Sequence, residues 1–244
     1  MKKIMQNILS GTRKTEPLAF LRGEMIVSCQ AEGNDPFNVP EYVALFAKAA
    51  QMGGAKGIRT EGLEKIKAIR RTVNLPVIGL LKSHFEDGSV KITGSIQEVA
   101  DLVAAGCDII AIDGTFRERE GMTGPEFIAR MRRQYPDSVF LADIAIYQEA
   151  VACEEAGAHC VSTTLSGYTP ETRTDSSVAD FALIERASRG LSIPVFAEGR
   201  INTPADAAKA MSLGAYAVIT GTAITRPRVI TRWFVEAIKR RELH

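Results

Sequence analysis

The chain contains 244 residues, of which 45% are hydrophobic and 24% are charged, a balance typical of an ordinary globular protein rather than a disordered one. Its 30 Lys and Arg residues nearly balance 29 Asp and Glu residues, so it lacks the strongly basic character of a nucleic-acid-binding protein. No part of the sequence approaches the roughly 18 consecutive apolar residues that a membrane-spanning helix requires. We therefore expect neither nucleic acid nor a membrane as a partner.

The cysteine and histidine content indicates a cytoplasmic protein without a metal centre. The four cysteines include no C-x-x-C pair, and three lie in or beside apolar segments, which is typical of buried free thiols in a reducing compartment. The opening segment MKKIMQNILS has two lysines but no apolar run after them, so a signal peptide is not expected. The chain has three histidines, too few for a His-rich metal site, and we expect no metal.

Eight short apolar runs follow a lead of 22 residues. The runs span 25–30, 56–60, 76–81, 108–113, 138–143, 159–164, 194–198 and 216–220. They are apolar nearly throughout rather than alternating, which is typical of parallel strands buried on both faces. The segments between them carry apolar residues three and four positions apart, as at Leu63, Ile66 and Ile69, which predicts helices.

The helix boundaries carry sequence signals of their own. A glycine that can end a helix in the left-handed conformation precedes four of the runs. These glycines are Gly54, Gly106, Gly157 and Gly214. The segment from Ser95 to Glu98 has the pattern of a capping box, and Thr203-Pro204 places a cap before a proline at the first helical position.

Eight strands that alternate with helices predict an α/β fold, a single (β/α)8 or TIM barrel, rather than an open doubly wound sheet. An open sheet usually stops near five or six strands, and a barrel of this kind commonly uses about 250 residues. We find no linker, so residues 1–244 are expected to form one domain. The N-terminal lead, residues 1–22, is predicted to be a helix that covers the barrel floor.

In such a barrel the active site lies at the C-terminal ends of the strands. The polar residues at these ends and in the last loop include Gln30, Arg59, Lys82, Asp113, Asp143, Glu198 and Arg226. A partly desolvated amine at Lys82 would act as a base or form a Schiff base. Glu198 would act as a general acid/base or as the counter-ion of Lys82, and Asp113 before Gly114 is also compatible with a simple turn.

Two turns near the end of the chain predict a phosphate site. Gly199-Arg200-Ile201 and Gly221-Thr222 each follow an apolar run, and both can expose backbone N–H groups at the barrel mouth. In the first turn we expect the backbone to matter more than the Arg200 side chain. The loop around Tyr168 is rich in hydroxyls and glycine and could close over a ligand, whereas His84 lies in a polar loop and is expected to be exposed.

Six motifs together resemble N-acetylmannosamine-6-phosphate 2-epimerases. In chain order they are IVSCQA, GIRTEG, PVIGLLK, DIIAIDGT, STTLSGYT and AEGRINTP. The resemblance runs from the first strand to the last helix. It implies conversion of N-acetylmannosamine 6-phosphate to N-acetylglucosamine 6-phosphate in bacterial sialic acid catabolism, without a cofactor.

The resemblance also assigns roles to individual residues. The family's catalytic lysine and glutamate fall on Lys82 and Glu198, and its substrate-binding glutamine, arginine and aspartate fall on Gln30, Arg59 and Asp143. A late arginine that contacts the sugar falls on Arg226. The small-molecule partner is then a sugar phosphate, whose phosphate would bind at the two turns described above.

The residues alone leave other functions open. A class I aldolase or synthase would use Lys82 to form an imine with a phosphorylated substrate. A biosynthetic barrel acting on a phosphoribosyl compound would share the two phosphate turns. A sugar-phosphate-sensing barrel without catalysis would keep those turns but gives no reason for Lys82 and Glu198 to share one mouth. A homodimer is compatible with the sequence, which does not identify an interface because the exposed faces of barrel helices look alike.

Overall fold

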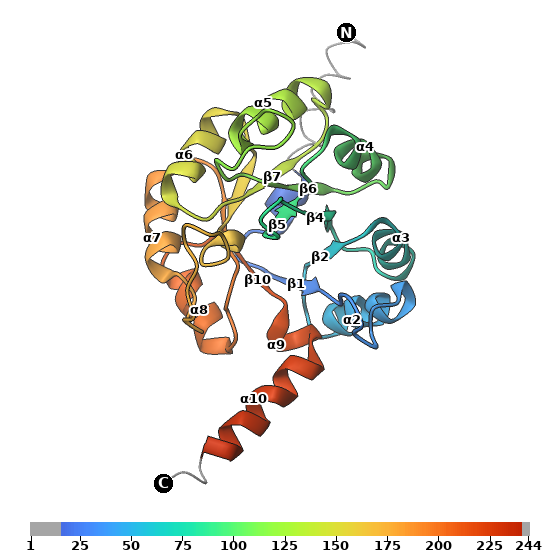
Figure 1. Ribbon diagram of the computed structural model, residues 1–244. Helices are drawn as coiled ribbons and strands as arrows, with labels where there is room; N and C mark the ends of the chain where they lie inside the picture. The colour runs from blue at the N-terminus through green and yellow to red at the C-terminus, as the bar shows by residue number, and fades with distance from the viewer. Residues whose placement is uncertain (1–15, 241–244) are drawn as a thin grey trace.

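A computed structural model describes residues 16–240, in which eight parallel strands close into a barrel (Figure 1). The strands are β1 (Met25–Cys29), β2 (Gly57–Glu61), β3 (Val77–Leu80), β6 (Ile109–Asp113), β7 (Phe140–Asp143), β8 (Cys160–Ser162), β9 (Val195–Ala197) and β10 (Ala217–Thr220). Around the ring the order is β1-β10-β9-β8-β7-β6-β3-β2. The predicted (β/α)8 barrel is therefore confirmed, and each predicted run overlaps one strand.

Helices cover the outside of this ring. They are α2 (Pro40–Met52), α3 (Leu63–Thr72), α4 (Ile96–Ala104), α5 (Gly124–Gln134), α6 (Tyr147–Glu155), α7 (Phe181–Gly190) and α8 (Pro204–Ser212). The expected capping box is present at α4, where the Glu98 N–H donates to Ser95 Oγ at 3.2 Å and the Ser95 N–H donates to Glu98 Oε2 at 3.0 Å. The helix α8 begins with the same device at Thr203 and Asp206.

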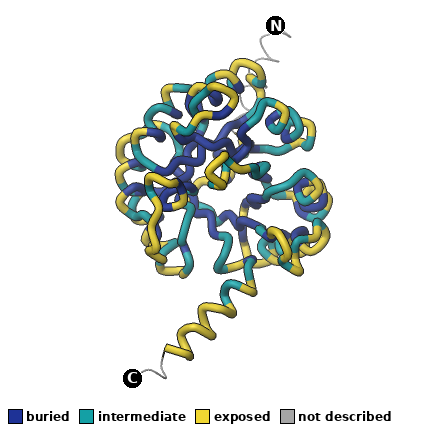
Figure 2. Tube along the Cα trace, in the orientation of Figure 1, coloured by how far each residue is buried: buried dark blue, intermediate teal, exposed yellow. Residues whose placement is uncertain are grey.

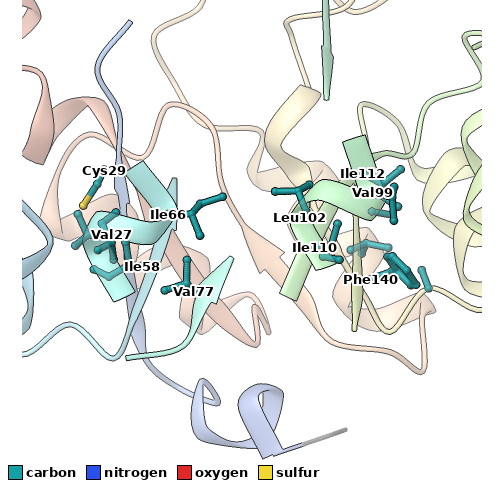
Figure 3. Close-up of a cluster of buried hydrophobic side chains, with 14 of the residues drawn as sticks. Val27, Cys29, Ile58, Ile66, Val77, Val99, Leu102, Ile110, Ile112 and Phe140 are labelled. Carbon is teal, nitrogen blue, oxygen red and sulfur yellow. The ribbon is translucent and has the colours of Figure 1, made fainter. Parts of the chain in front are cut away.

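The core has two layers because neighbouring residues of each strand point to opposite faces. On β6, Ile109 belongs to the cluster inside the barrel, together with Phe196. Its neighbour Ile110 belongs to the cluster between strands and helices, which Figure 3 shows around Ile66 and Leu102. The strands are consequently formed mostly of buried residues (Figure 2), and the closed ring holds their C-terminal ends at one rim.

The described part of the N-terminal lead packs at the opposite end of the barrel. Residues 16–20 are helical, and Leu18 and Leu21 are buried in the interior cluster. Tyr216, just before β10, donates its hydroxyl to the Leu18 carbonyl at 3.0 Å. The remainder of the predicted helix, residues 1–15, lies outside the described residues.

Two features differ from a plain barrel. The segment read as a polar loop around His84 contains an antiparallel hairpin of β4 (Lys82–His84) and β5 (Val90–Ile92), which we did not predict. The short helices η1 (Thr163–Leu165) and α9 (Thr222–Thr225) follow β8 and β10, and the final helix α10 (Pro227–Arg240) extends away from the ring (Figure 1). None of the residues of α10 is buried. Over residues 16–240, no helix is long and apolar enough to cross a membrane.

Candidate active site

A cavity of about 700 Å³ opens at the C-terminal rim of the barrel. Nearly all of the predicted site residues line it: Gln30, Arg59, Lys82, Glu198, Gly199, Arg200, Ile201, Gly221, Thr222 and Arg226. Asp143 lies behind them and is fully buried. The structure thus brings together residues that are up to 196 positions apart because their strands all end at the same rim.

The deepest part of the site is an ionic cluster around Arg59, which is 1% exposed. Its guanidinium donates to Asp143 Oδ1 at 3.1 Å and to Asp143 Oδ2 at 2.7 Å, a bidentate pair. The same guanidinium lies 3.4 Å from Glu198 Oε2. Two carboxylates therefore share one cation in a site with little access to water, where uncompensated charge is costly.

A single hydroxyl joins the two carboxylates. Thr164 Oγ1 lies 2.6 Å from Asp143 Oδ1 and 2.8 Å from Glu198 Oε2, and 2.8 Å from Ser162 Oγ. A hydroxyl has one proton to donate. If both carboxylates were ionised, one of the two short contacts would bring together two lone pairs. The hydrogen-bond count therefore favours a proton on one of the carboxylates.

The electrostatics of the cluster favours the same conclusion. Burial raises the pKa of the Glu198 carboxyl, Asp143 raises it further, and Arg59 offsets only part of the increase. Burial likewise raises the pKa of Asp143 despite the opposing effect of Arg59. Burial alone would lower the pKa of Arg59, but Asp143 and Glu198 outweigh it and keep the guanidinium charged. A carboxyl whose pKa is raised holds its proton to a higher pH than a free carboxyl does, which suits a group that gives and takes protons.

Lys82 faces this cluster from the opposite side of the mouth. It follows β3, and Glu198 follows β9; these strands are four positions apart in either direction around the ring of eight. The Lys82 ammonium donates to Gln30 Oε1 at 3.1 Å and pairs with Glu32. Two groups that can carry protons therefore face one cavity from opposite walls.

Glu32 is the main residue that the sequence reading missed. Its carboxylate bridges Lys82 and Arg226, whose Nη2 lies 3.0 Å from Glu32 Oε1. Burial alone would raise the pKa of Glu32, but Lys82 and then Arg226 outweigh it and lower the pKa. The sequence feature that could have identified Glu32 as a site residue is its position two residues after Gln30, in the loop that follows β1.

The first of the two predicted phosphate turns, at residues 199–201, has a left-handed backbone. Gly199 and Arg200 both adopt positive φ angles, 97° and 57°, and a non-glycine residue in this region is uncommon and points to a functional constraint. The N–H groups of Gly199, Arg200 and Ile201 donate to no acceptor within residues 16–240. Gly221 precedes α9, and Thr222 is its first residue.

The Arg200 side chain turns to the neighbouring loop instead of the cavity floor. It donates to the carbonyls of Ser166 and Val178, each at 2.7 Å, and its guanidinium lies 5.4 Å from the Tyr168 ring centre. The turn is thereby tied to the loop after β8, and Tyr168 itself lines the cavity.

Asp113 belongs to a different cluster. Its carboxylate pairs with Arg117 at 2.9 Å and with Arg119 at 3.0 Å, and none of these three residues lines the cavity.

His84 is exposed, as expected. Among the described side chains, no group of three or more His, Cys, Asp or Glu residues could hold a metal ion.

The fold and the rim cavity define a (β/α)8-barrel enzyme. Residues 43–240 match the family model described as putative N-acetylmannosamine-6-phosphate epimerase. A putative N-acetylmannosamine-6-phosphate 2-epimerase from Caldanaerobacter subterraneus subsp. tengcongensis is 47% identical over 91% of this chain and 93% of its own length. One from Clostridioides difficile is 45% identical over 90% and 97%.

The solved structures include the N-acetylmannosamine-6-phosphate 2-epimerase from Clostridium perfringens. It is 38% identical, has a TM-score of 0.84, and the match covers 90% of this chain and 95% of that one. A thiamine phosphate pyrophosphorylase from Pyrococcus furiosus, at 16% identity and a TM-score of 0.57, shares the fold alone. The chain therefore belongs to the N-acetylmannosamine-6-phosphate epimerase family, and the resemblance drawn from its motifs is confirmed.

Proposed function

We propose that this protein inverts C2 of N-acetylmannosamine 6-phosphate to give N-acetylglucosamine 6-phosphate, a step of sialic acid and amino sugar catabolism. The observation that carries the proposal is the placement of Lys82 and Glu198 on opposite walls of one cavity. Inversion at carbon requires a proton to leave from one face and to return on the other, and opposed proton carriers suit that demand.

The chemistry begins with ring opening, because the C2 proton is acidic only when C1 is an aldehyde. Lys82 removes this proton to give an enolate, and a proton returns to C2 on the opposite face. In our proposal Glu198, with its raised pKa, delivers this proton, and Lys82 does so in the reverse reaction. The reaction moves protons and no electrons, so it needs no cofactor.

The other predicted residues bind and orient the sugar phosphate. Arg59, fixed by Asp143, and Gln30 stabilise the negative charge of the enolate, which is usually the largest contribution of an enzyme. Arg226 contacts the sugar once substrate displaces Glu32. The N–H groups of 199–201 and of 221–222 hold the phosphate, and this binding energy orients the reacting end.

The experiment is incubation with N-acetylmannosamine 6-phosphate in deuterated water, followed by proton NMR. Substrate, reaction and proton exchange are tested together: N-acetylglucosamine 6-phosphate with deuterium at C2 is the expected product. Lys82→Ala should lose turnover with an unchanged melting temperature. Near-normal activity of this variant, or no product from this substrate, would contradict the proposal.

Borohydride treatment separates the epimerase from an imine-forming enzyme. The proposed reaction forms no covalent bond to Lys82, so reduction in the presence of substrate should leave the mass of the protein unchanged. A stable adduct on Lys82 would instead support the aldolase or synthase alternative. Binding of the sugar phosphate without any turnover would support the sensing barrel.

We also propose a cytoplasmic homodimer. The cytoplasm is supported by four free cysteines, three of them buried, as is usual in reducing compartments. The dimer is supported by helix α10, which extends from the barrel and exposes Trp233, Phe234 and Ile238. An amphipathic helix of this kind is expected to bury its apolar face. We propose that a second copy of this chain covers that face. Light scattering should give twice the chain mass, and Phe234→Asp should yield monomer. A monomeric parent protein would contradict the dimer.

A further inference from the structure

The β4–β5 hairpin is an insertion between β3 and α4, and Lys82 is its first residue. Its pairing is short, from Lys82 opposite Ile92 to His84 opposite Val90. Two three-residue strands are marginal on their own in water. The position of the Lys82 amine therefore depends on whatever holds this hairpin against the barrel.

One anchor is at the base of the hairpin. The Thr93 N–H donates to the Leu81 carbonyl at 2.8 Å, and the Leu81 N–H donates back to Thr93 Oγ1 at 3.2 Å. Thr93 is fully buried and has a φ of 49°. A β-branched residue in this region is strained, so the surrounding structure must enforce the conformation. This anchor joins the two residues that flank the hairpin, Leu81 and Thr93, and neither of its hydrogen bonds involves the hairpin residues themselves.

The second anchor is Arg117, from the loop between β6 and α5. Its Nη1 donates to Ser89 Oγ at 2.8 Å and its Nη2 to the Val90 carbonyl at 3.2 Å. Both acceptors lie on the returning half of the hairpin and line the cavity. The guanidinium also lies 4.2 Å from the centre of the Phe85 ring, at a distance suited to a cation–π contact.

The barrel holds Arg117 in turn. Arg117 Nη2 donates to Asp113 Oδ2 at 2.9 Å and Nε donates to Thr115 Oγ1 at 3.1 Å. Asp113 is the last residue of β6 and is fully buried. Arg119 binds the other oxygen of the same carboxylate at 3.0 Å and is itself buried. One planar guanidinium thus joins a rigid strand end to three residues of the hairpin.

We propose that Arg117 is a positioning residue of the reaction. It clamps the hairpin and thereby fixes the Lys82 amine at the mouth without touching the substrate. The inference rests on the proposed role of Lys82. A lysine could replace it only in part, because an ammonium is a point donor and cannot span Asp113, Ser89 and Val90 at once.

The test compares Arg117→Ala with the parent enzyme in steady-state kinetics and in hydrogen–deuterium exchange. Misplacement of a reacting group by about 1 Å costs on the order of 100-fold, so kcat should fall by about 10- to 100-fold, while KM changes by less than about threefold. Exchange should accelerate in peptides covering 82–92 and stay unchanged in the barrel strands. Arg117→Lys should recover part of kcat because the charge next to Asp113 remains.

Other outcomes would overturn the proposal. The first is a kcat within about twofold of the parent, because a displaced reacting group should lower kcat far more than this. The second is a rise in KM at constant kcat, and the third is unchanged hydrogen exchange of the hairpin. Arg130→Ala, which removes an exposed arginine of α5, is the matched control and should behave like the parent.

Two further variants cover the case in which Arg117→Ala fails to fold. Ser89→Ala and Phe85→Leu each remove one contact of Arg117 and leave its pair with Asp113 intact. Both should lower kcat and accelerate hairpin exchange, and full activity of both would count against the clamp. The proposal also fails separately from the proposed function. Normal activity of Lys82→Ala sinks the epimerase mechanism, whereas hairpin exchange reports on Arg117 whatever the role of Lys82.

Discussion

Two buried ionic clusters lie side by side at the barrel rim, and they differ in their charge balance. Asp113 and Asp143 end neighbouring strands and are directly paired in register. Asp113 contacts two guanidinium groups, those of Arg117 and Arg119. Asp143 instead shares the guanidinium of Arg59 with a second carboxylate, that of Glu198.

The difference separates a structural cluster from a reactive one. Where cations are in excess, both oxygens of the carboxylate are paired with arginines, and its hydrogen bonds hold a loop and a hairpin in place. Where carboxylates are in excess, burial raises the pKa values of both, and the cluster is ready to exchange a proton. Similar residue types at adjacent positions of one rim thus serve rigidity in one case and proton transfer in the other.

Glu198→Gln is the sharpest test of the reactive cluster. The amide keeps the shape of the side chain but cannot exchange a proton, so kcat should fall by about 10²- to 10⁴-fold, the range for loss of a general acid or base. Because the variant also removes a carboxylate that shares Arg59 with Asp143, its melting temperature at pH 7 should not be lower than that of the parent. Activity assays and thermal denaturation check the two parts, and retained kcat would remove Glu198 from the mechanism.

Asp113→Asn should instead lower the stability of the fold. It leaves Arg119, whose side chain is fully buried, without a counter-ion, and burial already lowers the pKa of this arginine. Breaking a buried ion pair by removing one partner costs about 3–5 kcal/mol, which denaturant unfolding would detect. The control is Asp175→Asn in an exposed loop. If Asp113→Asn is as stable as the control, the Asp113 cluster does not stabilise the fold.

The sequence located the fold and most of the rim, but it could not separate these two clusters. The fully apolar strands and the glycines before them are local sequence patterns that predict a barrel of parallel strands. The topology of the barrel then brings Lys82 and Glu198 to the same mouth. Asp113 and Asp143 look alike in sequence because each follows an apolar run. They differ in the arginines that contact them. Asp113 is contacted from the loop that follows it, whereas Asp143 is contacted by Arg59 of β2, 84 positions away.

The hairpin and Glu32 were missed for related physical reasons. The hairpin strands have three residues each and sit in a polar segment, so no alternating pattern marks them. Their order comes from contacts with Arg117, in a different loop. Glu32 is a loop residue whose two partners lie 50 and 194 positions away. Contacts of this kind are set by the closed barrel and leave no local signal.

The pH dependence of stability offers a smaller test of the same comparison. The folded protein binds a proton at Glu198 more tightly than the unfolded chain does, since the folded pKa is raised. The contribution of Glu198 to stability is therefore fully present below its unfolded pKa, about 4.3, and is lost as the pH rises through the folded pKa. Each tenfold difference in proton affinity corresponds to about 1.4 kcal/mol.

Thermal denaturation from pH 4 upward would measure this effect as the difference between the parent protein and Glu198→Gln. The parent should lose stability relative to the variant as the pH rises above about 4.3. A difference that stays constant with pH would mean that Glu198 is ionised in the folded protein as readily as in the unfolded chain. The excess of carboxylates over cations would then have no consequence for proton binding.

The smallest stability effect is expected at the partly exposed carboxylate of Glu32, which bridges Lys82 and Arg226. Glu32 is 42% exposed and pairs with Lys82 and Arg226, so water screens its charge far more than in either buried cluster. Glu32→Gln should therefore change the free energy of unfolding by no more than about 1 kcal/mol. Yet substrate must displace this carboxylate from both cations before it can bind them, so the variant should lower KM. Denaturant unfolding and initial-rate kinetics separate the two quantities; a large loss of stability with no change in KM would make Glu32 a third structural ion pair.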